Sequence, residues 1–211
     1  MKFCVIGLGR FGKQVATTLA ENDADVLAID EHESEIVSIQ NLVTQALCAK
    51  IHDIDSLEAT GVEEMDVVIL CIGEDIAQSI LVAALINKHY PNIRIVARAT
   101  STTQQEILSL IGVDQVVRPE QETAIELADT LSSPFTNLCR LDQDTSIALI
   151  NAPDTFIGKS IEEINFHGNH KTNCVFIKNE NNLILAHENY IVLEGDKLII
   201  AGENENISQL I

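Results

Sequence analysis

Six apolar runs of strand length, separated by segments with helical periodicity, fill most of the first 132 residues. The runs predict strands at 2–7, 24–30, 42–48, 65–73, 93–99 and 114–119. The other segments predict helices at 10–22, 33–39, 56–61, 76–90, 102–112 and 120–131. The run at 65–73 is apolar at nearly every position, which is typical of a strand buried on both faces of a parallel sheet. The alternation therefore predicts an α/β fold with a doubly wound, Rossmann-type parallel sheet.

The pattern changes after residue 132, where strand-like runs alternate with only short helical segments. We expect a strand at 145–152, a short helix at 160–164 and a closing helix at 204–211. A hairpin is expected at 173–186, with its turn at 179–182, and a second strand pair at 190–202. The chain is thus divided into a first domain, residues 1–132, and a small α+β C-terminal lobe, residues 133–211.

Three glycines follow the first predicted strand in the spacing G-x-G-x-x-G: Gly7, Gly9 and Gly12. In such a loop the first glycine makes a tight turn, the second lets a phosphate approach the backbone, and the third lets the helix pack against the strand. Asp30 closes the second predicted strand, where a carboxylate accepts hydrogen bonds from ribose hydroxyls and disfavours a 2′-phosphate. The pattern predicts a site for a nucleotide with an unphosphorylated ribose, and it does not choose among NAD, ATP and ADP.

The composition narrows the class of partner. With 13 Lys and Arg against 32 Asp and Glu, the formal net charge is −19, so nucleic acid and anionic lipid are poor general partners, whereas a basic protein surface is a plausible one. The five cysteines include no C-x-x-C pair, and Cys4, Cys48 and Cys71 lie in apolar runs where we expect buried thiols. No apolar stretch approaches the roughly 20 residues of a membrane span, and no signal-peptide pattern precedes the first strand, so we expect a cytoplasmic protein.

The sequence offers little for catalysis. A dehydrogenase needs an acid or base beside the nicotinamide and a substrate pocket, normally supplied by a second domain. The histidines fall in loops or at element ends, and the spacing H-G-N-H at 167–170 is expected to be a solvated loop rather than a metal site. We therefore predict that the chain is not an enzyme; the alternatives are a nicotinamide-dependent oxidoreductase with a reduced second domain, and a free-standing nucleotide sensor.

Several blocks, in this order and spacing, carry a resemblance that covers nearly the whole chain: VIGLGRFG, VLAIDEH, VVILCIGED, IVARATS, IGVDQVVRPEQE, FIGKSIEEINF and YIVLEGDKLIIAGE. The chain resembles the RCK-type regulatory subunits of Ktr/Trk potassium-uptake systems, with an RCK-N (TrkA-N) domain at 1–132 and an RCK-C (TrkA-C) domain at 133–211. The resemblance implies a homodimer that assembles into a higher ring, an octamer, on the cytoplasmic face of a membrane-embedded potassium-translocating protein. It also implies an ATP- or ADP-dependent change of the ring, with NAD(H) as an alternative ligand.

The resemblance also implies which residues hold the nucleotide. Arg10 matches an arginine that reaches toward the terminal phosphate across a dimer interface, although it also has the position of a solvated residue in a first helical turn. Glu120 matches an acid linked to a divalent cation bound with ATP, and it could equally be an acid favoured by a helix start. The remaining positions follow the phosphate, ribose, adenine and strand-end segments of the family: Gly7, Gly9, Phe11, Gly12, Asp30, His32, Lys50, Ile51, Ile72, Gly73, Glu74, Arg98, Ala99, Thr100 and Gln104.

Some relatives bind cyclic di-AMP between paired C-terminal lobes. Asn173 matches an asparagine of that site, whereas His167 replaces the basic residue commonly found there. The resemblance thus allows cyclic di-AMP as a ligand of the second lobe without requiring it.

Overall fold

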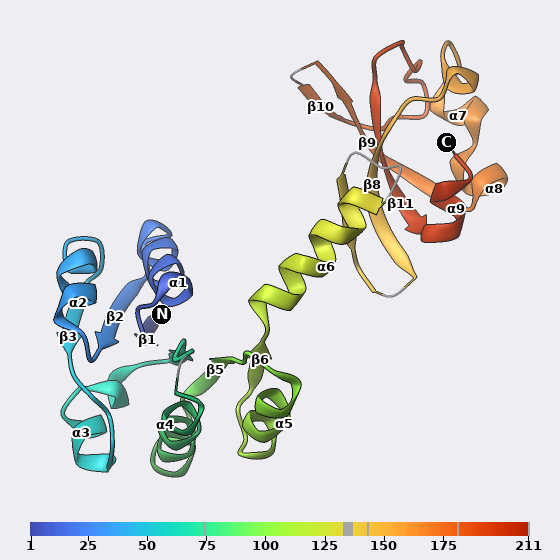
Figure 1. Ribbon diagram of the computed structural model, residues 1–211. Helices are drawn as coiled ribbons and strands as arrows, with labels where there is room; N and C mark the ends of the chain where they lie inside the picture. The colour runs from blue at the N-terminus through green and yellow to red at the C-terminus, as the bar shows by residue number, and fades with distance from the viewer. Residues whose placement is uncertain (74, 133–136, 143, 181, 211) are drawn as a thin grey trace. The chain divides into compact units, whose positions relative to one another are not determined.

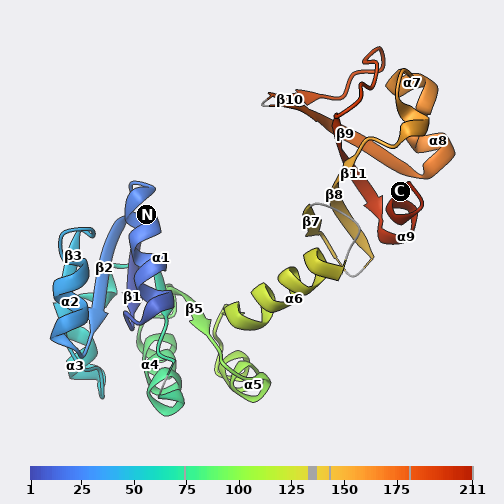
Figure 2. The same cartoon turned by 45° about the horizontal axis from the view of Figure 1, so that its top comes forward.

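The computed structural model describes residues 1–73, 75–132, 137–142, 144–180 and 182–210 (Figures 1 and 2). The chain forms two compact units, Met1–Glu120 and Gln121–Ile211, and each is described by itself. Helix α6 (Pro119–Ser132) begins where the first unit ends. The boundary expected from the sequence, at residue 132, lies at the other end of this helix and stays a prediction.

The first unit contains one sheet of six parallel strands. These are β1 (Lys2–Ile6), β2 (Asp25–Asp30), β3 (Gln45–Cys48), β4 (Val67–Leu70), β5 (Arg94–Arg98) and β6 (Gln115–Val117). Their order is β3-β2-β1-β4-β5-β6, with parallel pairing throughout. The order reverses between β1 and β4, and this topological switch point is where open α/β sheets bind their ligands. The predicted doubly wound Rossmann-type sheet is confirmed.

Helices cover both faces of this sheet. They are α1 (Arg10–Glu21), α2 (Glu33–Ile39), α3 (Ile54–Glu58), α4 (Ile76–His89) and α5 (Thr102–Leu110), with a 3₁₀ turn η1 (Val62–Glu64). One buried cluster joins α1 and α2 to the sheet through Ala16, Ile36 and Ile39. The opposite cluster joins α3, α4 and α5 through Leu57, Val82 and Leu108.

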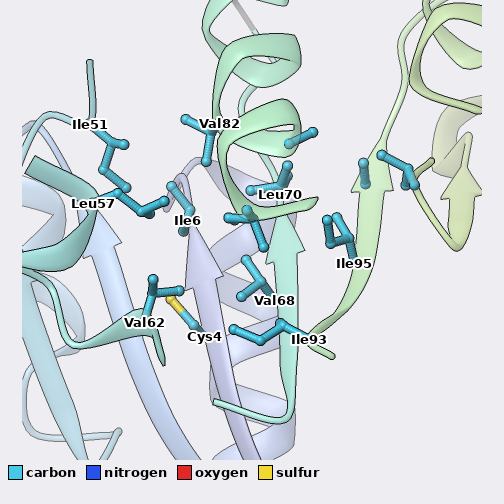
Figure 3. Close-up of a cluster of buried hydrophobic side chains, with 14 of the residues drawn as sticks. Cys4, Ile6, Ile51, Leu57, Val62, Val68, Leu70, Val82, Ile93 and Ile95 are labelled. Atoms are coloured by element: carbon cyan, nitrogen blue, oxygen red, sulfur yellow. The ribbon is translucent and has the colours of Figure 1, made fainter. Parts of the chain in front are cut away.

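The side chains of β1 show how this layering arises from a strand's alternation. Cys4 and Ile6 pack in the cluster beneath α4, which Figure 3 shows, whereas Val5 packs in the cluster of α1 and α2. A central strand therefore needs apolar residues at every position, since both of its faces are buried. The expectation of a buried thiol holds for Cys4 and Cys71 but is wrong for Cys48, which is exposed because β3 forms the edge of the sheet.

The second unit contains an antiparallel sheet of five strands in the order β10-β9-β11-β8-β7. The strands are β7 (Asn137–Arg140), β8 (Thr145–Asn151), β9 (Thr172–Asn179), β10 (Asn182–Leu185) and β11 (Lys197–Glu203). Its short helices are η2 (Asp154–Phe156), α7 (Ile161–Ile164), α8 (Phe166–His170) and α9 (Asn204–Ser208). Ile150, Ile177 and Leu198 pack from the sheet onto Phe166 and Ile207 of these helices. The expected α+β lobe and the β9–β10 hairpin are confirmed.

Two local expectations for this lobe are wrong. The segment 190–202 contains one strand, β11, and not a strand pair. The carboxylate of Asp196, 3% exposed, accepts hydrogen bonds of 2.9 Å from both the Tyr190 hydroxyl and the Leu193 amide, which closes a loop before β11. Ile191 contributes only an isolated bridge, to Ser160. The H-G-N-H spacing at 167–170 lies in helix α8 rather than in a loop, and the His170 ring packs against Phe156.

Across the described parts of the chain, no helix combines the length and the hydrophobicity that crossing a membrane requires.

Candidate functional site

A cleft of about 1120 Å³ opens at the carboxyl ends of the parallel strands, around the switch point between β1 and β4. Residues from the ends of β1, β2, β4 and β5 line it, together with the first turn of α1 and the start of α6. Parallel strands all have their carboxyl ends at the same edge of the sheet, so several strands contribute residues to one cleft.

The glycine loop forms the floor of this cleft. Gly7 has φ +93°, a left-handed conformation that favours glycine, and its amide donates to Ile29 O at 2.8 Å. A Cβ at Gly12 would lie 1.9 Å from Gly7 O, so α1 packs directly onto the loop. A Cβ at Gly9 would meet no atom within 4 Å, so the loop backbone faces open space there. The three glycines thus have the three roles that phosphate binding requires.

The N-terminus of α1 has no side-chain cap, unlike those of two neighbouring helices. Asp75 caps α4 by accepting from the Gln78 amide, and Ser101 caps α5 by accepting from the Gln104 amide. At α1 the cap residue is Gly9, which has no side chain to accept from the first amides. These amides and the positive end of the helix dipole favour an anion at this point of the cleft.

Three cationic side chains line the same cleft: Arg10, Lys13 and Arg98. Arg10 is exposed at the first position of α1 and forms no ion pair with any residue that the structure describes. Arg98 is less exposed, at 19% of its side chain, and its guanidinium lies 5.9 Å from the centre of the Phe11 ring and pairs with Glu120. In a chain of net charge −19, three cations around an uncapped helix start make a local site for an anion.

Asp30 is the acid at the end of β2, with a side chain only 10% exposed. Its Oδ2 accepts from the Leu8 amide at 2.6 Å, and its Oδ1 accepts from the His32 amide at 2.8 Å and contacts His32 Nδ1 at 3.0 Å. A carboxylate offers about four acceptor positions, so one stays free, and the His32 ring, 70% exposed, can turn away to open another. Asp30 can thus accept from the two hydroxyls of a ribose.

The structure brings most of the residues expected at the site into this one cleft. Those that line it are Gly7, Gly9, Arg10, Phe11, Asp30, His32, Ile51, Ile72, Gly73, Arg98 and Glu120. Those that do not line it are Gly12, Lys50, Ala99, Thr100 and Gln104. Glu74 lies outside the described residues.

Local contacts explain the second group. Gln104 is 1% exposed, and its Oε1 accepts from the Thr100 amide at 2.8 Å, so this pair closes the turn between β5 and α5. Ala99 is buried in the core. The Lys50 ammonium binds the Glu31 carboxylate at 2.6 Å, which raises the pKa of Lys50, and Glu31 rather than Lys50 faces the cleft.

The sequence interpretation missed other lining residues: Ile6, Leu8, Lys13, Glu31, Ser34, Glu35, Ala49, Cys71, Asp75 and Gln78. Lys13 could have been found, since it lies three positions after Arg10 and therefore on the same face of α1. Asp75 and Gln78 carried no comparable signal, because they reach the cleft through the start of α4.

The cleft holds little of what a covalent catalyst needs. Burial raises the pKa of the Cys71 thiol to about 12, so it stays protonated and weakly nucleophilic at neutral pH. His32 lies beside the acid Asp30 at the end of β2. No group of three or more His, Cys, Asp or Glu suited to a metal ion occurs within the described ranges. The arrangement can bind an anion and a ribose.

Two family models match this chain. The TrkA-N domain matches residues 3–119, and the TrkA-C domain matches residues 146–211. The chain belongs to the TrkA-N/TrkA-C family. Among its relatives, the Ktr system potassium uptake protein C of Bacillus subtilis (strain 168) is 30% identical over 99% of this chain and 95% of its own length. The Ktr system potassium uptake protein A of the same organism is 29% identical over 99% of this chain and 94% of its own length.

Solved structures of the GsuK channel share the fold of this TrkA-N/TrkA-C chain. GsuK bound to NAD has a TM-score of 0.59 and 23% identity, covering 99% of this chain and 37% of the GsuK chain. GsuK bound to ADP has a TM-score of 0.52 and 25% identity, covering 62% of this chain and 34% of the GsuK chain. This chain therefore spans little more than a third of the channel that it resembles.

Proposed function

We propose that this protein is a cytoplasmic, nucleotide-binding regulatory subunit of a potassium-uptake system, and that it controls a separate potassium-translocating protein in the membrane. The observation that carries the proposal is the division of charge in the cleft. Cations gather at the first turn of α1 and at the end of β5, and Asp30 lies at the end of β2. A nucleotide has the matching division, with phosphates at one end and a ribose in the middle.

The residues of the cleft fit a nucleotide in stated roles. The free backbone at Gly9 and the uncapped start of α1 receive the inner phosphates. Asp30 accepts from the ribose hydroxyls, and its negative charge disfavours a 2′-phosphate. Ala49, from the segment after β3, supplies apolar surface for a base, whereas Ile51 beside it is 2% exposed and belongs to the core. Asn173 and His167 lie exposed on the second unit, where cyclic di-AMP stays an untested prediction.

ATP and ADP are the proposed ligands, with NAD(H) as the alternative. NAD and ADP are the ligands named for the GsuK structures. ATP and ADP differ by one phosphate. The exposed guanidinium of Arg10 at the start of α1, which pairs with no acid among the described residues, is suited to respond to that difference. A divalent cation beside Glu120 remains part of the proposal for the ATP-bound form.

A regulator accounts for the cleft better than an oxidoreductase with a reduced second domain. Hydride transfer needs a proton donor or acceptor beside the nicotinamide, whereas His32, the histidine among the described lining residues, contacts Asp30, which is assigned here to the ribose. The thiol in the cleft is protonated at neutral pH. Binding without chemistry requires neither group.

The partner is proposed from the relatives, which are named as potassium uptake proteins. This chain covers nearly the whole length of both. Apolar residues exposed on α6, among them Ile125, Leu127 and Leu131, support assembly with further copies of this chain into dimers and a higher ring.

Purification from the native host tests this proposal. The tagged chain is expected to retain an adenine nucleotide, identified after denaturation, and to co-purify with an integral membrane protein whose potassium flux depends on ATP and ADP. Retention of NAD(H) with turnover of a small substrate would support the oxidoreductase instead. Retention of a nucleotide with only soluble partners would support a free-standing sensor.

A further inference from the structure

Arg98 is held at the cleft by three separate segments. Its guanidinium lies 5.9 Å from the centre of the Phe11 ring, in the first turn of α1. A Cβ at Gly73, just after β4, would lie 2.5 Å from Arg98 Nη1, so the guanidinium occupies the space above this glycine. The side chain itself leaves the end of β5. Phe11 and Gly73 therefore contribute to the placement of the guanidinium in addition to its ion-pair partner Glu120.

The guanidinium has more donors than the described residues use. Of its five N–H groups, one on Nη2 donates to Glu120, and Nε is buried with no acceptor among the residues that the structure describes. A buried donor without a partner costs free energy, so an added acceptor at this point is favoured. A phosphate offers several oxygens in a geometry that matches the guanidinium fork.

Glu120 is a replaceable partner. Its side chain is 63% exposed, whereas that of Arg98 is 19% exposed. Hydrogen bonds from its own amide and from Arg98 lower the pKa of Glu120, so the carboxylate is ionised at neutral pH. Water can solvate an exposed carboxylate that leaves its partner, so an exposed ion pair is only weakly held.

We propose that Arg98 is a second determinant, beside Arg10, of specificity for the number of phosphates, and that a terminal phosphate takes Arg98 from Glu120. This rests on the proposed function, because it concerns the same cleft. The inner phosphates belong at the start of α1, and Arg98 lies against Phe11 of that first turn, so a third phosphate extends toward Arg98. A terminal phosphate carries close to two negative charges and a carboxylate carries one, so the phosphate competes better for the guanidinium. ADP leaves the Arg98–Glu120 pair intact.

The exchange acts on α6, because Glu120 is the second residue of this helix and the last residue of the first unit. While it is paired, Glu120 ties the first turn of α6 to the end of β5. Once it is released, this turn loses that restraint, and the amides of the next turn, which donate to its carbonyls, exchange with solvent more readily.

Calorimetric titrations in EDTA, which keeps divalent cations from bridging Glu120 and phosphate, test the exchange. Glu120→Gln removes the competing charge, so ATP affinity is expected to rise about ten-fold, or about 1.4 kcal/mol, with ADP affinity unchanged. Arg98→Gln is expected to weaken ATP binding. In the double variant, Arg98→Gln with Glu120→Gln, the gain in ATP affinity is expected to disappear, which is the signature of direct coupling. Glu64→Gln, which breaks the exposed pair with Lys2, and Arg94→Gln, at the other end of β5, are the matched controls.

Hydrogen exchange gives an independent readout. In the wild type, ATP but not ADP is expected to speed exchange of the amides that donate to the carbonyls of the first turn of α6. In Glu120→Gln, these amides are expected to exchange fast with either nucleotide. This inference would be overturned, and the proposed function left standing, by unchanged or weaker ATP binding of Glu120→Gln in EDTA. Hydrogen exchange in α6 that is the same with and without ATP would have the same consequence. Failure of the wild type to bind either nucleotide would overturn the proposed function and this inference together.

Discussion

The carboxylate of Asp30 accepts a 2.6 Å hydrogen bond from the backbone amide of Leu8, which joins the end of β2 to the glycine loop that follows β1. The same carboxylate contacts His32 through its other oxygen. Asp30 therefore ties the glycine loop to the end of β2. In the proposed function it also presents an acceptor to the ribose, so it would couple the ribose end of the cleft to its phosphate end.

Asp30→Ala is expected to weaken the binding of ATP and of ADP equally, by about 2 kcal/mol, because both nucleotides present the same ribose to the same charged acceptor. Calorimetric titration with each nucleotide measures the effect. Asp30→Asn, which keeps one oxygen acceptor of the same size, is expected to fall between Ala and the wild type. A loss confined to one of the two nucleotides would contradict the assignment of Asp30 to the ribose.

Arg10→Ala is expected to lower ATP affinity by about 1–3 kcal/mol and ADP affinity by much less, since a guanidinium can bind a terminal phosphate that ADP lacks. A ligand shifts a conformational equilibrium only through different affinities for the two states, so this difference is what a switch requires. Titration of the variant with both nucleotides decides the matter, with Arg94→Ala as a control of equal charge. Equal losses for ATP and ADP would show that Arg10 does not sense the terminal phosphate.

Alanine substitutions at two glycines of the loop are expected to have opposite effects. Gly12→Ala would bring a Cβ within 1.9 Å of Gly7 O and is expected to lower the free energy of unfolding by about 1–3 kcal/mol, the usual cost of overpacking. Gly9 has φ −59° and space around its Cβ position, so Gly9→Ala is expected to leave stability nearly unchanged and to weaken nucleotide binding.

Thermal unfolding and calorimetric titration separate these two outcomes. A Gly12→Ala variant as stable as the wild type would contradict the close packing of α1 on the loop. A Gly9→Ala variant that binds ATP as the wild type does would contradict the placement of phosphates at this residue.

Assembly is expected to begin with a dimer. The exposed apolar residues of α6, Ile125, Leu127 and Leu131, and those of α4, Ile76 and Leu81, leave more apolar surface than a lone unit needs. Light scattering at micromolar concentration is expected to give a mass of at least two chains. A monomer under these conditions would contradict the prediction.

Much of the first domain could be predicted from the sequence because its signals are local. The alternation of apolar runs sets the parallel sheet, and Gly7, Gly9 and Asp30 reach the cleft simply by following strand ends. Individual side-chain contacts set the rest. Gln104 also follows the end of a strand, but it lies in the S-x-x-Q spacing of a capping box after Ser101, and its side chain turns back to the Thr100 amide rather than into the cleft.

The second lobe shows the same limit. The segment before β11 alternates in a strand-like way, but the buried carboxylate of Asp196 holds Tyr190 and Leu193 in a loop instead. Cys48 lies in an apolar run and is nevertheless exposed, because the order of strands, and not the run itself, makes β3 an edge.

Above all, we propose that the cleft at the start of α1 binds an adenine nucleotide whose phosphate number is the signal. Titration of the purified wild-type chain with ATP and with ADP, each followed by displacement with the other, tests it most directly. Both nucleotides are expected to bind saturably to one shared site per chain, with different affinities. No saturable binding of either nucleotide at millimolar concentration, or equal affinities for the two, would contradict the claim.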